Sequence, residues 1–527
     1  MMNTLRKQSN RIGIVLLLLM TSIGFISCDK ELDLEPVIEQ TAANVFDDPA
    51  AYEQFLARIY AGFVVSGQQG PAGNPDISGI DEGFSNYLRQ YWKHQQLTTD
   101  EALIAWNDGT IHDLNWQTWT PANEFITAMY NRIYYQISIS NEFLRATADV
   151  PESEFLTAAY KAEVRFLRAM SYWHAIDMFG NVPFVTDADP VGAFLPPQGS
   201  RQEVYDFIIA ELTEIEPMMI DARQNAYGRA DKAALWMLLA KIYLNAEVYT
   251  GTDQSAQAIP YLENVIGAGY VLHDNYDELF LADNDTNGAQ NEFIFTFNSD
   301  GLNTQGFGAM TFLVHAPVGG NMSAANFGIN GGWGGIRTTS TFVNKFSASE
   351  LIVDQRANFF TDGQNLEIED VYNFNDGYAV EKFKNVTSNG APGSDSSGDF
   401  IDTDFPVFRL ADAYLMYAEA VKRSGTGDQG LAVQYVNLVR LRSSANPIGG
   451  FSDITDTFLL AERSKELHWE AHRRTDLIRF GQFSDQGVWP WKGNVEGGTT
   501  TAAYRDLFPI PATDITANPN LTQNSGY

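Results

Sequence analysis

Apolar residues recur at helical spacing over most of this chain. Within residues 46–66, four apolar side chains fall on one face of a helix: Ala51, Phe55, Ile59 and Phe63. The same period predicts longer amphipathic helices at residues 121–147, 153–179 and 202–220. The pattern therefore predicts a mainly α-helical protein.

Two further regions combine small and large apolar residues in the manner of paired helices. The first helix of each pair spans residues 230–245 or 409–421, and the second follows at 258–270 or 431–442. This arrangement is typical of a tetratricopeptide-like helix pair. Ordinary packing of two helices would give the same spacing, but two instances favour a partly degenerate repeat scaffold rather than a long solenoid.

The helical period fades between residues 271 and 400. Residues 292–298 alternate like a β-strand, and residues 306–335 are rich in glycine, asparagine and aromatic side chains. Residues 386–399 have the composition of a disordered loop. Long irregular loops on a helical scaffold usually carry function, so we expect the ligand-binding half here, with a few short strands.

The N-terminus has the pattern of a lipoprotein leader. Three basic residues precede an apolar stretch at residues 12–26, and Ser27 then leads to Cys28, the only cysteine in the chain. The stretch is too short for a comfortable membrane span. An ordinary secretory signal would share these features, but the position of the sole cysteine favours cleavage before Cys28 and attachment of lipid to it.

These patterns predict the following organisation of the chain. We expect a signal peptide at residues 1–27, an acidic anchor linker at 28–40 and a single domain at 41–527. The domain would consist of a helical scaffold at about 41–270 and 401–527, with a loop-rich insert at about 271–400. Without a second cysteine the domain has no internal disulfide, so its core must supply its stability.

The chain is strongly acidic, with a formal net charge of −32. Such a surface repels nucleic acids and anionic polysaccharides, so neutral ligands are favoured by elimination. Simple solubilisation would explain the charge equally well.

Six short segments follow one another in a specific order: residues 163–169 (EVRFLRA), 179–183 (FGNVP), 228–234 (GRADKAA), 408–414 (FRLADAY), 466–481 and 509–527. Each alone is weak, but together they resemble the SusD/RagB family of outer-membrane nutrient-binding lipoproteins. The resemblance implies a helical fold with tetratricopeptide-like pairs and a loop-rich ligand-binding half. It also implies a SusC-like TonB-dependent transporter as the partner to which glycans are delivered. In such lipoproteins an acidic segment after the cysteine, like residues 29–36 here, is similar to a signal for export to the outer face of the outer membrane.

The charged residues of these segments favour a structural role. Pairs of arginine and carboxylate on facing helices explain them better than catalysis does. They are Arg165, Arg168, Asp231, Glu466, Arg473, Arg474 and Asp476.

Aromatic residues on loops are the candidates for ligand contact. Neutral sugars present apolar C–H faces edged by hydroxyl groups, which suit flat rings and polar side chains. Trp106 follows an acidic pair, with Trp116 and Trp119 as alternatives, while Phe307 and Trp333 lie in the glycine-rich stretch. Because glycines flank Trp333 on both sides, we expect this ring to have little packing role and rank it first.

Three more segments are similar to the starch-binding members of the family: residues 75–83, 99–106 and 489–493. This closer resemblance implies that Asp81 and Arg89 contact sugar hydroxyls, and that Phe307 and Trp333 belong to an arc of aromatic rings. The chain departs from the pattern at Ile104, where a second arc tryptophan is expected, and at Gly109, where an asparagine is expected. The departures leave starch and a differently linked glucan, such as a β-1,3-glucan or dextran, both open as ligands.

One segment reads like half of a calcium loop. Asp283, Asp285 and Asn287 place oxygen ligands at alternate positions, but the twelfth position holds Ile294 instead of a bidentate glutamate. Polar turn chemistry explains the segment equally well. A structural Ca²⁺ would therefore need help from elsewhere, from Asp402 and Asp404.

Motifs for catalysis are lacking, since the sequence holds no HExxH pair, nucleophile elbow or Walker loop. We expect a binding protein that requires no cofactor. A surface glycoside hydrolase, which needs two carboxyl groups flanking the bond, and a peptide-binding importer component are the alternatives.

Overall fold

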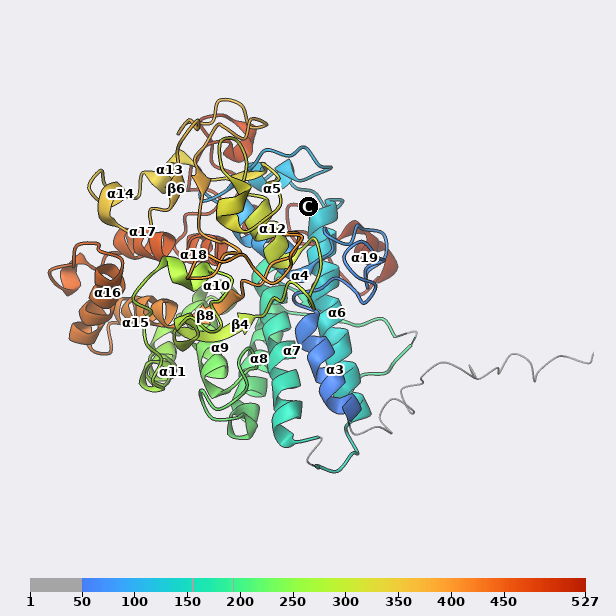
Figure 1. Cartoon of the computed structure of the whole chain (residues 1–527). Coiled ribbons are helices and arrows are strands. Elements are labelled where there is room, and N and C mark those ends of the chain that lie inside the picture. Colours follow the sequence, from blue (N-terminus) through green and yellow to red (C-terminus); the bar gives the residue numbers. More distant parts are fainter. Residues whose placement is uncertain (1–49, 154–155, 193) are drawn as a thin grey trace, which may run out of the picture. The chain divides into compact units, whose positions relative to one another are not determined.

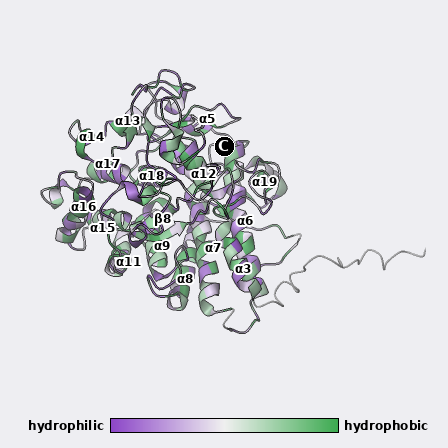
Figure 2. Ribbon diagram, viewed as in Figure 1, coloured by the Kyte–Doolittle hydropathy of each residue, from purple (hydrophilic) through white to green (hydrophobic). Residues whose placement is uncertain are grey.

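Long helices form one side of the scaffold, as the apolar period predicts. The computed structural model describes residues 50–527 except 154, 155 and 193. Helix α7 (Ala158–Phe179) packs along much of its length on α6 (Glu124–Ala146) and α8 (Arg201–Ile215). Helices α3 (Ala50–Ala61) and α9 (Lys232–Leu244) lie beside this group (Figure 1). Apolar and polar residues alternate along these helices (Figure 2). The prediction of a mainly α-helical protein is confirmed.

Local sequence sets the ends of these helices. The side chain of Asn123 accepts hydrogen bonds from the amides of Phe125 and Ile126 and so begins α6. Ser200 and Glu203 form a capping box at the start of α8. Helix α7 ends at Gly180, whose φ of 72° favours glycine.

Two helix pairs continue the scaffold. Helix α9 packs on α11 (Ser255–Gly267), α11 packs on α15 (Leu410–Ser424), and α15 packs on α16 (Gln429–Arg442). Each pair holds a stacked tyrosine pair between its helices. The ring centroids of Tyr243 and Tyr261 lie 5.8 Å apart in the first pair, and those of Tyr414 and Tyr435 lie 4.6 Å apart in the second. Stacked tyrosines therefore support both tetratricopeptide-like pairs.

Shorter helices complete the described part. They are α4 (Tyr87–Trp92), which continues into the π-helical turn η1 (Lys93–Leu97), α5 (His112–Trp116), α10 (Ala246–Thr250), α12 (Ala309–His315), α13 (Ser340–Val343), α14 (Glu350–Val353), α17 (Asp456–Leu467), α18 (Arg473–Arg479) and α19 (Ala512–Ala517).

The strands of the described residues form antiparallel pairs. They are β1 (Leu103–Ile104) with β5 (Ile336–Arg337), β2 (Val182–Pro183) with β3 (Gln198–Gly199), β4 (Phe293–Phe297) with β8 (Phe405–Arg409), and β6 (Phe359–Phe360) with β7 (Ala379–Val380). The predicted strand at 292–298 is β4, and all of its residues are buried.

The loop at 386–399 is more ordered than its composition predicts, because carboxylates bind its backbone. One oxygen of Asp402 accepts hydrogen bonds from Ser394 Oγ and from the amide of Gly301, both at 2.7 Å. Asp395 Oδ2 accepts from the amides of Asp399 and Phe400, each at 3.0 Å. Short polar residues here close turns rather than leave the chain free.

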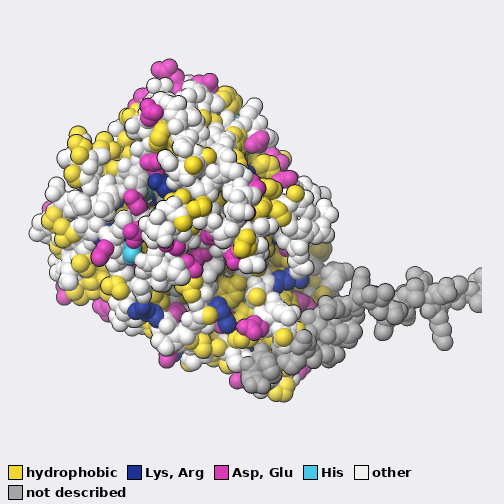
Figure 3. Space-filling model, viewed as in Figure 1, with side chains coloured by type: hydrophobic (Ala, Val, Ile, Leu, Met, Phe, Trp, Pro, Cys, Tyr) yellow, Lys and Arg dark blue, Asp and Glu magenta, His cyan; other side chains and the backbone are white. Residues whose placement is uncertain are grey.

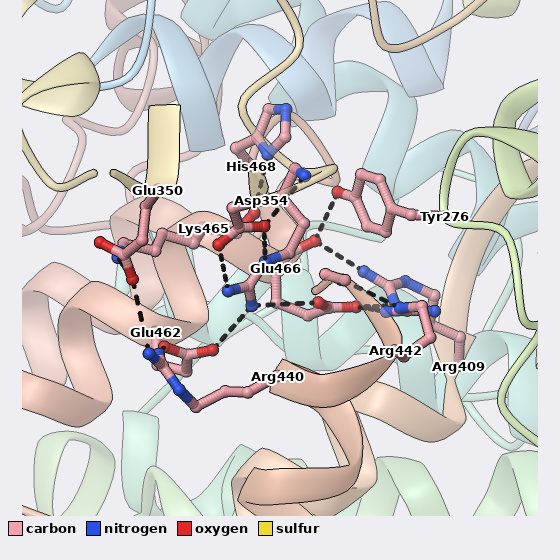
Figure 4. Close-up of polar contacts among 12 residues, drawn as sticks. Tyr276, Glu350, Asp354, Arg409, Arg440, Arg442, Glu462, Lys465, Glu466 and His468 are labelled. Atoms are coloured by element: carbon pink, nitrogen blue, oxygen red, sulfur yellow. Dashed lines mark hydrogen bonds and ion pairs between the residues drawn. The ribbon is translucent and has the colours of Figure 1, made fainter. Parts of the chain in front are cut away.

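A buried network of ion pairs joins the second helix pair to the loop-rich region (Figure 4). Arg409 reaches Glu292 at 2.9 Å, and Glu466 and Glu470 at 2.6 Å each. Arg356 pairs with Glu462 at 2.7 Å and also contacts Glu466. Arg409 and these carboxylates are at most 1% exposed. Arg442 also contacts Glu292 and Glu466, and Lys382 contacts Glu470, so each of these glutamates pairs with at least two cations.

The structural role predicted for the family's charged residues is confirmed. Arg168 bonds Glu211 at 2.9 Å, Arg473 bonds Asp100 at 2.7 Å, and Asp231 caps the start of α9. The other members of the set make similar contacts: Arg165 with Glu211, Arg474 with Asp177, Asp476 with Arg463, and Glu466 with Arg409.

Candidate functional site

An open depression lies where α4 meets the loop that follows β1. Its lining consists of Phe84, Arg89, Trp106, Asn107 and Asp108, and its volume is about 410 Å³. Two of the predicted ligand contacts, Arg89 and Trp106, therefore share one surface.

Trp106 and Trp333 form a ring pair beside this depression. Their centroids lie 6.2 Å apart with the planes at 45°, and Nε1 of Trp106 donates to the carbonyl of Trp333 at 3.0 Å. The pairing of β1 with β5 brings them together, since the amide of Ala105 also donates to the carbonyl of Gly335 at 2.7 Å. The structure thus unites two aromatic residues that are far apart in the sequence.

The glycines around Trp333 serve close packing rather than exposure of the ring. A Cβ at Gly335 would lie 2.4 Å from Cε2 of Trp106, and one at Gly332 would lie 2.1 Å from the carbonyl oxygen of Val318. The ring of Trp333 stacks on His315, with centroids 4.8 Å apart and planes at 23°. The expectation that Trp333 has little packing role is therefore wrong, although the ring remains partly exposed.

Arg89 is buried between two aromatic rings. Its guanidinium carbon lies 4.6 Å from the ring centre of Phe84 and 4.4 Å from that of Phe312, and the side chain is 5% exposed. Burial lowers the pKa of Arg89 to about 10, which leaves it charged at neutral pH. Its Nη1 donates to the carbonyl of Phe307 at 2.9 Å. Arg89 therefore fixes the loop that carries Phe307 as well as lining the depression.

Phe307 lies at the edge of this arrangement. Its side chain is 37% exposed, and its ring centre lies 5.7 Å from that of Phe400. The amide of Phe307 points to the carboxylate of Glu82 at 3.5 Å. Burial raises the pKa of Glu82 to about 7. Asp81 beside it is exposed, and its Oδ1 accepts from the amide of Gly83 at 3.0 Å.

The two departures noted in the sequence have structural reasons. Ile104 lies in β1 and is 0% exposed, so its side chain is core. Gly109 has a φ of 45°, and a Cβ there would lie 1.9 Å from Oε1 of Glu124. A side chain at position 109 is therefore excluded unless Glu124 moves.

The alternative tryptophans differ from each other. Trp119 is 0% exposed and donates to the hydroxyl of Tyr527, which makes it a core residue. Trp116 is partly exposed and stacks on His112, with centroids 4.9 Å apart.

Sequence reasoning missed the residues that support these rings. Phe84 lines the depression, while Phe312 and His315 come from α12 and pack against Arg89 and Trp333. Lys93 is 0% exposed, and its Nζ lies 4.1 Å from the ring centre of Phe125 with no hydrogen-bond partner in the described part of the chain. Lys93 follows Arg89 by one helical turn, which is the only local signal of their association.

Comparison with known proteins decides the family. A family described as "Starch-binding associating with outer membrane" matches residues 78–244, and one described as "SusD family" matches residues 353–527. The starch-binding protein SusD of Bacteroides thetaiotaomicron is 35% identical, and the alignment covers 97% of this chain and 98% of that protein. The chain belongs to the SusD family.

A further relative and two solved structures extend the comparison. SusD-like protein P2 of Formosa agariphila is 25% identical over 80% of this chain and 84% of its own length. The solved structure of surface glycan-binding protein A from Bacteroides fluxus matches with a TM-score of 0.70 at 21% identity and covers 90% of this chain and 99% of that one. The corresponding protein of Bacteroides thetaiotaomicron, solved in complex with laminarihexaose, matches with a TM-score of 0.68 at 20% identity, over 90% and 98% of the two chains. The SusD fold therefore extends over nearly the whole chain.

The segment that resembles a calcium loop ties two loops together. The carboxylate of Asp283 accepts from Ser388 Oγ at 2.7 Å and from its amide at 2.9 Å. Asn287 donates to the carbonyl of Glu278 at 2.9 Å, and Asp285 accepts from the hydroxyl of Thr286 at 3.1 Å. Among the described residues, no group of three histidine, cysteine or acidic side chains is arranged to hold a metal ion. The structural Ca²⁺ stays a prediction, for which calorimetry of chelated protein is the test.

The lipid anchor lies outside the described residues, as do Cys28 and the acidic segment after it. Within the described part, no helix is both long enough and apolar enough to cross a membrane.

Proposed function

We propose that this SusD-family protein captures a neutral glucan on the rings of Trp106, Trp333 and Phe307. The observation that carries the proposal is the tryptophan pair beside the buried charge of Arg89. Tilted rings match the apolar faces of successive sugars, while the open depression leaves room for a chain that continues past them. Asp81 and Arg89 would supply the hydrogen bonds to hydroxyl groups.

A neutral ligand fits the electrostatics of the protein. Carboxylates are scattered over the face shown in Figure 3, and Lys and Arg are few there. Asp81, Asp108 and Glu124 are exposed around the depression. An anionic polysaccharide would be repelled by these groups, whereas hydroxyl groups can donate to them.

The aromatic arc bears on which glucan the protein would bind. Starch and laminarihexaose, named for two relatives, are both glucans. Ile104 removes one ring that the starch-binding pattern expects, so we propose a glucan whose chain needs fewer rings than a starch helix. A β-1,3-glucan and dextran are the ligands to compare with starch.

The protein would act without catalysis, as a binding partner of a SusC-like TonB-dependent transporter in the outer membrane. Lipid on Cys28 would hold it at the cell surface. Replacing Cys28 with alanine should release the protein from the membrane and leave glucan affinity unchanged. Normal amounts of this variant in the membrane fraction would contradict the anchor.

A panel of neutral polysaccharides tests the function. We expect affinity electrophoresis to show retardation by at least one of amylopectin, laminarin and dextran, with no release of reducing sugar. Release of sugar would favour the hydrolase, and retention of peptides but not glucans would favour the importer component. Either result would overturn the proposal.

A further inference from the structure

The loop at residues 370–376 lies directly against the turn that carries Trp333. A Cβ at Gly334 would lie 3.9 Å from Cγ of Phe374, and one at Gly319 would lie 2.9 Å from Cε1 of the same ring. The ring of Phe374 therefore packs where side chains at positions 319 and 334 would otherwise lie. These distances place the loop against Gly334, the residue that follows Trp333.

The strand that carries the turn also holds this loop in place. Arg337 in β5 follows Gly335 by two residues and is 0% exposed. Its guanidinium donates to the carbonyls of Val371, at 2.6 Å, and of Asp376. A buried arginine that bonds backbone carbonyls fixes the loop relative to β5, and hence relative to Trp333.

The carboxylate of Asp376 closes the loop from within. Its Oδ2 accepts from the amide of Asp370 at 2.9 Å, and its Oδ1 accepts from the side-chain amide of Asn373 at 2.9 Å and from that of Asn365 at 3.0 Å. These bonds leave the loop little freedom, so the side chains that it presents are preorganised.

Tyr372 is the aromatic residue that this loop presents to solvent. Its side chain is 50% exposed, and its ring meets His112 edge-on, with centroids 5.1 Å apart and planes at 81°. His112 in turn stacks on Trp116. His112 in α5 thus supports the ring of Tyr372. Helix α5 follows Trp106 after a short loop. Exposed polar residues flank the ring, among them the uncharged Asn373 and Asn375.

We infer that Tyr372 is a further stacking ring, which extends the sugar-binding surface beyond Trp106 and Trp333. The inference rests on the proposed function, because it gives the same neutral glucan a longer binding surface. A short oligosaccharide would fill the tryptophan pair, and a longer one would also reach Tyr372. An ordinary half-exposed tyrosine would not alter affinity for either ligand.

The test is a length series of oligosaccharides titrated calorimetrically into wild type and Tyr372→Ala. The series runs from disaccharides to heptasaccharides, in both maltose-type and laminari-type linkages. We expect Tyr372→Ala to lower affinity for the longest bound member about 5- to 10-fold and to leave the shortest unchanged. Tyr372→Phe should keep wild-type affinity, since the ring rather than the hydroxyl makes the contact.

The controls separate this inference from the function on which it rests. Tyr227→Ala removes an exposed tyrosine from the surface beside α3 and should not change any affinity. If wild type binds no glucan, the proposed function fails. If wild type binds and Tyr372→Ala matches it at every length, the function stands and the further ring is refuted. An equal loss at every length, with an unchanged melting temperature, would also refute the extension.

Discussion

In the helical scaffold the buried Arg409 faces carboxylates, whereas the buried Arg89 beside the candidate site faces aromatic rings. Arg409 contacts three buried glutamates. Arg89 and Lys93 lie against Phe84 and Phe312, and no carboxylate of the described residues is within ion-pair distance of either side chain. The first arrangement uses up the hydrogen-bonding capacity of the cation. In the second, Nε of Arg89 is buried and has no hydrogen-bond partner among the described residues.

The difference indicates that the ion-pair network serves stability, whereas the arrangement around Arg89 serves recognition of a ligand. A saturated ion-pair network fixes chain segments to one another, and it is costly to break because each partner is left buried and charged. A cation packed on rings, such as Arg89, holds those rings in place without an ion-paired carboxylate beside it. An arrangement of this kind suits a ligand that offers hydroxyl groups and apolar faces.

Removal of Arg409 tests the scaffold side of the comparison and should have the largest effect. Arg409→Met takes one buried cation from Glu292, Glu466 and Glu470, which keep their contacts with Arg442, Arg356 and Lys382. Because the remaining buried charges are no longer balanced, we expect the variant to destabilise the fold by about 3–5 kcal/mol. Urea denaturation measures the loss. The matched control is Arg145→Met, which breaks an exposed pair with Glu142 and should cost below about 1 kcal/mol. Similar small losses in both variants would contradict the role of the network.

The pH dependence of Glu82 tests the site side. Burial raises its pKa to about 7 in the folded protein, so the folded state holds a proton that the unfolded state loses at lower pH. The resulting stability is fully present below the ordinary carboxyl pKa and is lost as pH rises through about 7, to a total of about 3 kcal/mol. Glu82→Gln should remove this component of the pH profile. An unchanged profile in that variant would assign the pH dependence to other groups.

Replacement of Lys93 should have the smallest effect and the opposite tendency to that of Arg409. Lys93→Met keeps the length of the side chain and removes a buried amine that has no hydrogen-bond partner in the described structure. We expect the stability to stay within about 1 kcal/mol of wild type or to rise. A loss as large as that of Arg409→Met would show that attraction between the amine and the rings outweighs its desolvation, and would remove the contrast between the two regions.

The sequence predicts the helical scaffold well because its signals are local. The apolar period and caps such as Asn123 and Ser200 lie within each helix. The strand β4 was also recognisable, but its partner β8 was not, since pairing between distant segments leaves no local trace. Order in residues 386–399 was missed because it depends on carboxylates elsewhere, including Asp402.

Some residues of the candidate site can likewise be predicted from the sequence, and others cannot. Trp106 and Trp333 stand out by composition and by resemblance, and the structure brings them into contact. The role of the glycines, the ring of Phe84 and the position of Glu124 beside Gly109 all depend on contacts between segments distant in the sequence. Such contacts are fixed by the tertiary fold, so residue patterns alone could not supply them.

Glucan binding by Trp333→Ala tests the central claim most directly. Isothermal titration with the tightest-binding glucan of the panel should show affinity reduced by at least about 10-fold, because one face of the ring pair is lost. The stacked contact with His315 is lost as well, so the melting temperature should fall modestly. Trp236→Ala is the matched control, since it removes a partly exposed tryptophan of α9 that bonds Glu216. We predict that Trp236→Ala melts earlier but binds like wild type, whereas Trp333→Ala loses binding. Wild-type affinity in folded Trp333→Ala would contradict the assignment of the glucan to this surface.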